Sequence, residues 1–192
     1  MREGDGAWIQ NVVFIDYNSP SLERVFEIYM RKSPNLYTPS ANNVISMRNE
    51  LIIGYTSGVF DLFHIGHLNL LKNAKAMCTK LIVGVTTDEL ALYKNKVPVI
   101  PYSERLEIVR SIKYVDAVVA QEDMDKLTMC KKLKANIMFV GDDWYATEKW
   151  NAYEEEFCEA GIKIVYFPYT KGTSSTLLNK VLLQKLTEPA SS

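Results

Sequence analysis

Short apolar runs alternate with helix-like segments along most of this chain, and this alternation is the strongest constraint on its fold. Runs typical of buried strands lie at 51–55, 81–85, 117–119, 137–141 and 162–167. Helices are expected from Leu68 onward, over 104–112, 126–134 and 148–160, and from Ser174 or Ser175 through Leu186. Strands that alternate with helices form a parallel sheet covered on both faces. We therefore predict an α/β fold whose ligands bind beyond the carboxyl ends of the strands, where we expect all candidate residues.

Boundary residues and the first 49 residues complete this expectation. Ser103 is expected to cap the helix over 104–112, and Gly161 is expected to end the helix over 148–160. Residues 1–49 form an N-terminal extension, with a strand at 12–15 and a helix opened by Ser19-Pro20. The apolar stripe of that helix is expected to pack on the core or on a second subunit. It consists of Leu22, Val25, Phe26 and Tyr29. Residues 50–192 form the main domain.

The composition limits the possible partners and location of the chain. Its 192 residues are 47% hydrophobic and 23% charged, as in a globular protein, and a net charge of −1 argues against a broad nucleic-acid surface. The sequence contains no run of about 20 apolar residues, so no membrane-spanning segment is predicted. The amino terminus lacks the apolar core of a signal peptide, and three scattered cysteines indicate reduced thiols. We expect a cytoplasmic protein.

Both histidines of the chain lie in one short segment, at His64 and His67. The segment joins the strand at 51–55 to the helix that follows, so the histidines stand near a helix N-terminus. Free backbone N–H groups and the helix dipole make such an end an anion site. Gly66 has no side chain, so a phosphate could approach the backbone closely there.

Five strings in order resemble motifs of one enzyme family. They are Gly58–His67 with its H-x-G-H pattern, Thr87–Lys96, Lys113–Asp116, the G-D-D-W string Gly141–Trp144, and Thr170–Thr176. Together they are similar to the cytidylyltransferases of the HxGH nucleotidyltransferase superfamily, and most of all to glycerol-3-phosphate cytidylyltransferases. The resemblance covers residues 50–186 and implies a Rossmann-like nucleotidyltransferase fold.

The resemblance also implies a reaction and a set of site residues. The enzyme would transfer CMP from CTP to a small phosphorylated alcohol, giving CDP-glycerol and pyrophosphate for a cell-surface polymer, with Mg²⁺ on the triphosphate. Such transfers depend on positioning and charge neutralisation. Catalytic roles would belong to His64, His67, Lys94, Lys96 and Lys113. Lys94 would reach the acceptor. Further nucleotide contacts would come from Val59, Phe60, Asp142, Lys171, Ser174, Ser175 and Thr176. No metal ligand is predicted from protein side chains, and a homodimer is expected.

Two departures from the family pattern leave alternatives open. Tyr169 and Lys113 stand where the family has arginine, which offers a fork of donors to phosphate. Lys171 could replace the first arginine. The alternatives are a choline- or ethanolamine-phosphate cytidylyltransferase, an adenylyltransferase of the same superfamily, or a non-catalytic nucleotide-binding regulator. Asp142 and Asp143 could instead cap a helix, and Arg105 is expected to anchor only its own helix.

Overall fold

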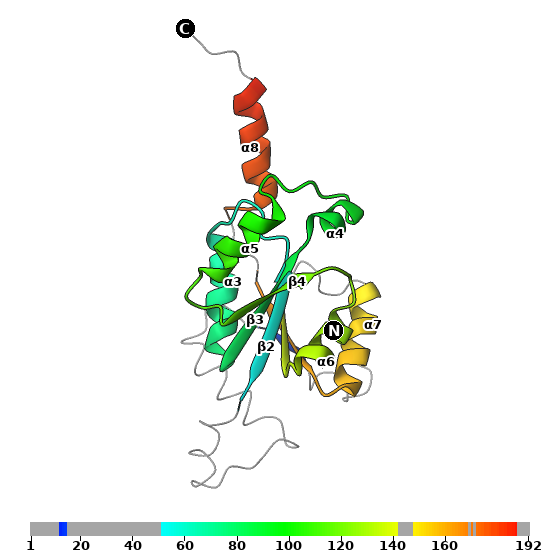
Figure 1. Cartoon of the computed structure of the whole chain (residues 1–192). Coiled ribbons are helices and arrows are strands. Elements are labelled where there is room, and N and C mark those ends of the chain that lie inside the picture. The colour runs from blue at the N-terminus through cyan, green and yellow to red at the C-terminus, as the bar shows by residue number, and fades with distance from the viewer. Residues whose placement is uncertain (1–11, 15–50, 142–147, 169, 171, 188–192) are drawn as a thin grey trace.

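A parallel six-stranded sheet with helices on both faces forms the body of the protein (Figure 1). The computed structural model describes residues 12–14, 51–141, 148–168, 170 and 172–187. The strands are β1 (Val12–Phe14), β2 (Ile53–Gly58), β3 (Lys80–Thr86), β4 (Ala117–Gln121), β5 (Ile137–Gly141) and β6 (Lys163–Phe167). The helices are α3 (Ile65–Ala76), α4 (Asp88–Tyr93), α5 (Tyr102–Arg110), α6 (Lys126–Leu133), α7 (Glu148–Glu159) and α8 (Ser175–Thr187).

The strand order locates the expected ligand site. It runs β1-β6-β5-β2-β3-β4, and every neighbouring pair is parallel. The chain moves outward in one direction from β2 through β3 to β4, then returns to β5 on the other side of β2. This reversal beside β2 is the topological switch point, where parallel α/β sheets bind ligands at their carboxyl ends. The segment that carries both histidines leaves the sheet at that point.

Each face of the sheet carries its own apolar core. Helices α3 and α5 pack on one face, where Leu71 and Val109 meet Phe139 of the sheet. Helices α6 and α7 pack on the other, where Cys130 and Phe157 are wholly buried. The predicted parallel α/β architecture with two covered faces is therefore confirmed.

Several predicted boundaries are wrong by a few residues. The strand predicted at 51–55 is β2, which begins at Ile53 and extends to Gly58 because its pairing with β3 continues that far. Leu51 lies before it and is exposed. The following helix begins at Ile65. Ser103 caps nothing: α5 begins at Tyr102, after Pro101, and lacks a side-chain cap. Gly161 does end α7, in the left-handed conformation that favours glycine (φ 69°).

Two short elements change the prediction further. Helix α4 was not expected, although Thr87 accepts a hydrogen bond from the backbone N–H of Leu90 as a helix cap should. The predicted strand at 12–15 is confirmed over Val12–Phe14, which pairs with β6 at the sheet edge. The predicted helix opened by Ser19-Pro20, with its apolar stripe, lies outside the described residues.

Helix α8 extends away from the sheet in Figure 1 and keeps apolar side chains such as Leu177 and Leu183 exposed. Among the helices in the described part of the chain, none is both long and apolar enough to cross a membrane.

Candidate functional site

The turn between β2 and α3 has a strained backbone. Phe60 and Leu62 adopt positive φ angles of 54° and 45°, which are uncommon for residues other than glycine. Such strain persists only where surrounding contacts hold the chain, and it is typical of functional loops. Phe60 supplies one such contact, since its side chain is buried and its ring packs edge-on against His67 at 5.3 Å between ring centroids. Phe60 thus supports the site through packing.

His64 caps the N-terminus of α3. Its Nδ1 accepts a hydrogen bond from the backbone N–H of Gly66 at 3.0 Å. Because Nδ1 is the acceptor, the proton of the neutral ring lies on Nε2, which can donate to a ligand. Gly66 is required for this geometry, since a Cβ there would lie 2.8 Å from Cε1 of His64. The glycine of the H-x-G-H motif makes room for the histidine ring.

His67 stacks on His64, with 3.9 Å between ring centroids and 28° between ring planes. Burial lowers the pKa of His67 to about 3, and the neighbouring His64 contributes to this shift. Burial also lowers the pKa of His64. Both rings are therefore neutral near pH 7. The Nδ1 atom of His67 is buried without a hydrogen-bond partner within the described part of the chain. Such an orphaned polar atom is unusual and would gain from a ligand.

The beginning of α8 meets the beginning of α3. The hydroxyl of Ser175 donates a hydrogen bond to the backbone carbonyl of Asp61 at 2.6 Å. Asn69 of α3 donates to the hydroxyl of Thr170 at 3.3 Å. Ser174 caps α8 by accepting from the N–H of Leu177. The N-termini of α3 and α8 thus lie at the same turn, where their partial positive charges together favour binding of an anion.

Four of the predicted nucleotide-binding residues lie around this turn, three of them with hydroxyl groups, and they differ in what they contact. Ser175 uses its hydroxyl proton to hold α8 to the turn, and Ser174 stabilises the helix start. Thr176 is exposed at the same helix end. Val59 lies on the turn itself, and its carbonyl accepts a hydrogen bond from Arg105. All four lie at the carboxyl edge of the sheet or on the segments just beyond it.

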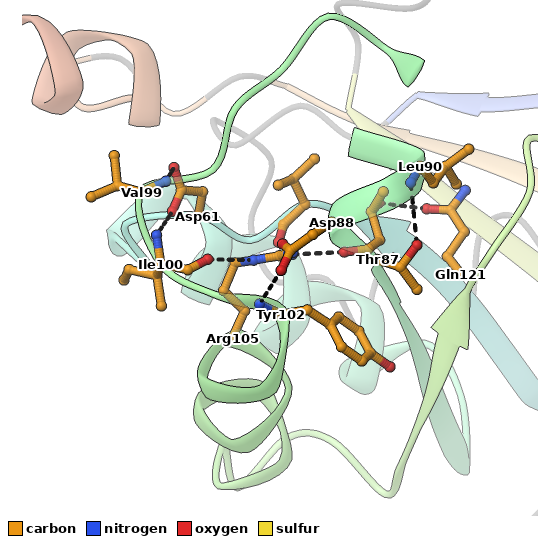
Figure 2. Close-up of polar contacts among 11 residues, drawn as sticks. Asp61, Thr87, Asp88, Leu90, Val99, Ile100, Tyr102, Arg105 and Gln121 are labelled. Carbon is orange, nitrogen blue, oxygen red and sulfur yellow. Dashed lines mark hydrogen bonds and ion pairs between the residues drawn. The ribbon is translucent and has the colours of Figure 1, made fainter. Parts of the chain in front are cut away.

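The lysine loop, residues 94–100, follows α4 at the same edge of the sheet. Lys94 is half-buried, Lys96 is exposed, and Asn95 between them has a positive φ of 56°. The loop is attached to the histidine turn, because the carboxylate of Asp61 accepts hydrogen bonds from the N–H groups of Val99 and Ile100. Figure 2 shows Asp61 facing these two residues.

Sequence reasoning missed the role of Arg105. We expected it to anchor only its own helix, yet this wholly buried side chain contacts Asp88 and three backbone carbonyls. Figure 2 shows it at the centre of the polar network. The backbone N–H of Tyr102 lowers the pKa of Asp88, and Arg105 adds to this effect. A signal was present: Arg105 lies one turn before the buried Val109, so a charge was placed on the core face of the helix.

Lys113 lies away from the histidines. It precedes β4, whose first residue Ala117 pairs with Ile82 near the start of β3. Our expectation that every candidate follows a strand is therefore wrong for Lys113, which stands at the amino edge of the sheet. Its Nζ lies 5.2 Å from the ring centroid of Tyr114. A single chain does not bring Lys113 beside His64 and His67.

Other predicted residues lie outside the described part of the chain. They are Asp142, Asp143, Trp144, Tyr169 and Lys171. Among the residues that are described, there is no group of three or more histidine, cysteine, aspartate or glutamate side chains arranged to hold a metal ion.

Comparison with known proteins shows the family of the chain. The cytidylyltransferase-like family profile matches residues 55–192. Glycerol-3-phosphate cytidylyltransferase of Bacillus spizizenii is 36% identical over 126 residues, which cover 65% of this chain and 92% of that enzyme. FAD synthase of Pyrococcus abyssi is 32% identical over 145 residues, covering 73% and 94% of the two chains. A lipopolysaccharide core biosynthesis protein of Thermoplasma volcanium shares the fold with a TM-score of 0.55 and 26% identity, over 65% of this chain and all of that one.

Proposed function

Because the chain belongs to the cytidylyltransferase-like family, we propose that it transfers CMP from CTP to a glycerol phosphate. A phosphate oxygen of the acceptor attacks the α-phosphorus of CTP, the bond to the bridging oxygen breaks, and pyrophosphate leaves. CDP-glycerol is the second product. The observation that carries this proposal is the stacked pair of neutral histidines where the N-termini of α3 and α8 meet.

His64 and His67 would stabilise the negative charge that moves onto the leaving pyrophosphate. A neutral imidazole donates one hydrogen bond, and the Nε2 proton of His64 is available because Nδ1 is engaged with Gly66. Preorganised donors of this kind contribute roughly 3 kcal/mol each to transition-state stabilisation. The buried Nδ1 of His67 would gain a partner when the triphosphate or a water bound to it enters.

The lysine loop would supply positive charge on the acceptor side. In this proposal Lys94 contacts the acceptor phosphate and Lys96 contacts CTP. The loop that carries them is held at the histidine turn where Asp61 binds Val99 and Ile100, so the two substrates would approach one another across a short span. Holding two reactants in this way replaces an improbable encounter by a preformed geometry.

A magnesium ion would be bound chiefly by the substrate. Both oxygens of the Asp61 carboxylate already accept backbone N–H groups, which fits an ion held by phosphate oxygens and water. When bound, the ion would neutralise charge on the triphosphate. Asp142 and Lys171 keep their predicted roles as proposals from the sequence, as do the homodimer, the cytoplasmic location and the cell-surface pathway. Lys113 precedes β4 at the amino edge of the sheet, so its predicted catalytic role is not part of this proposal.

A release assay for pyrophosphate tests the proposal. The purified chain is incubated with Mg²⁺, with CTP or ATP, and with glycerol phosphate, phosphocholine, phosphoethanolamine or FMN. We expect release with CTP and glycerol phosphate, and its loss in the His64→Ala/His67→Ala double variant. Release with another acceptor would reassign the substrate.

The FAD synthase relative favours one second candidate, an ATP-dependent adenylyltransferase of the same superfamily. Faster release with ATP than with CTP would support that candidate over ours. Binding of CTP without release for any acceptor would instead favour a regulator that has lost turnover.

A further inference from the structure

The end of the lysine loop is held by a buried carboxylate. Asp61 is 8% exposed, and its Oδ2 and Oδ1 accept hydrogen bonds from the backbone N–H groups of Val99 and Ile100, each at 2.9 Å. Both oxygens therefore face the loop, although the residue belongs to the histidine turn. Removing a carboxylate from water is costly, and it is offset here by two charge-assisted hydrogen bonds to one dipeptide.

Arg105 holds the same dipeptide from the other side. Its Nε donates to the carbonyl of Ile100 at 2.9 Å, and its NH1 donates to the carbonyls of Val59 and Thr86. Its NH2 forms an ion pair with Asp88 at 2.6 Å. One planar guanidinium thus joins the histidine turn, the end of β3, the beginning of α4 and the lysine loop (Figure 2).

We propose that Asp61 and Arg105 act as one clamp that positions the lysine loop relative to His64 and His67, and thereby sets how the acceptor phosphate is recognised. This inference rests on the proposed function of that loop. Lysine side chains are long and flexible, so their reach depends on where the backbone is fixed. The clamp holds the backbone of Val99 and Ile100 at the end of the loop, after Lys94 and Lys96 in the chain. In the proposed function, these two lysines contact the ligands.

The same turn also holds the nucleotide side of the site. The backbone carbonyl of Asp61 accepts the hydroxyl of Ser175 at 2.6 Å, so α8 depends on the main chain of this residue and the lysine loop on its side chain. A side-chain substitution at Asp61 therefore separates its contact with the lysine loop from its main-chain contact with α8. It should disturb acceptor recognition while the α8 contact to the backbone remains.

Asp61→Asn is the main test. The amide keeps one acceptor oxygen but turns an NH₂ group toward a backbone N–H, so one bond is lost and two donors oppose each other. We expect the acceptor KM to rise about tenfold or more, the change for one unsatisfied donor, and the directly measured CTP Kd to rise less, because Lys96 is only one of several proposed CTP contacts. Hydrogen exchange of peptides covering residues 94–100 should become faster.

Two further variants separate positioning from general stabilisation. Arg110→Lys alters an exposed ion pair with Glu107 on the same helix as Arg105 and should leave KM, kcat and exchange unchanged. Asp61→Asn combined with Lys94→Ala should raise the acceptor KM little beyond Lys94→Ala alone, because residues that act through one another are not additive. A purely structural role for Asp61 predicts additive effects and equal losses for both substrates.

The outcomes decide between the clamp and the proposed function. A normal acceptor KM, or unchanged exchange over 94–100, in folded Asp61→Asn would overturn the clamp. If Asp61→Asn does not fold, Arg105→Lys carries the same expectations, since it keeps the charge and loses the fork. A wild-type chain that binds CTP but turns over no phosphomonoester contradicts the proposed function alone. Faster exchange in the variant then supports the clamp, and unchanged exchange rejects it.

Discussion

The burial of His67 makes the stability of this protein sensitive to mild acid. Burial lowers the pKa of His67 to about 3, whereas the ordinary value for histidine is 6.5. The unfolded chain therefore takes up a proton on His67 as the pH falls below 6.5, and the folded chain does not until much lower pH. The stabilisation by neutral His67 is present above pH 6.5 and is lost progressively as the pH falls toward 3.

The size of the effect follows from the two pKa values. Between pH 7 and pH 5 this single residue should reduce the free energy of unfolding by about 2 kcal/mol. For a chain of this size that corresponds to a decrease in Tm of roughly 4–8 °C. His67→Phe is the reference variant, because a phenyl ring preserves the packing on Phe60 and on the ring of His64 but cannot bind a proton.

Urea denaturation of both proteins at pH 5, 6, 7 and 8 measures the difference. Carboxylates titrate in both proteins, so their contributions cancel in the wild-type minus variant curve. That curve should fall by about 2 kcal/mol between pH 7 and pH 5. The chain has two histidines, so the variant also assigns their NMR signals directly. Parallel stability profiles, or a His67 signal that titrates near pH 6.5, would refute the assignment of a buried neutral imidazole.

Three other predictions concern activity and packing. His64→Ala should lower kcat by about a hundredfold or more, well beyond the loss of about 1 kcal/mol in stability expected from removing the cap of α3, and near-normal turnover would reject its role at the leaving group. Lys94→Ala should chiefly raise the acceptor KM and Lys96→Ala that of CTP; equal effects on both substrates would contradict this division. Gly84→Ala should cost about 1–3 kcal/mol in urea unfolding, because its Cβ would collide with the hydroxyl of Tyr55. Tyr55→Phe should recover part of that loss, and purely additive effects would show that the collision is not the cause.

The main elements were predictable because each has a strong local signal. The strand at 137–141 is apolar throughout and has the predicted bounds. Gly161 ends α7 as expected because few other residues adopt a positive φ without strain. Helix α4 escaped prediction because it has only six residues, too few for a hydrophobic period to be visible. Its Thr87 cap followed by Asp88 and Glu89 was the available signal.

The site was predictable to a different depth. The position of His64 and His67 after a strand follows from local order along the chain, and the structure places them at the switch point of the sheet. The hydrogen bond between Ser175 and Asp61 joins residues 114 positions apart. It forms only because the fold brings the start of α8 back to the turn before α3. No periodicity in the sequence contains that information. The position of Lys113 was predictable from the sequence, because a residue that precedes a strand lies at the amino end of that strand.

Arg105 and Asp61 illustrate why charged residues in such motifs are easily misread. Pattern alone did not reveal that Asp61 binds the backbone of the lysine loop, or that Arg105 contacts more than its own helix. In this fold both are buried, so their hydrogen-bonding capacity must be met within the protein. It is met largely by backbone groups of the turns that surround the site. A buried charge with several backbone partners holds those turns in one arrangement, since a shift of any partner would leave it unsatisfied. The buried charges of Asp61 and Arg105 therefore hold the turns around the histidines in place, whereas ligand contact is proposed for the less buried Lys94 and Lys96.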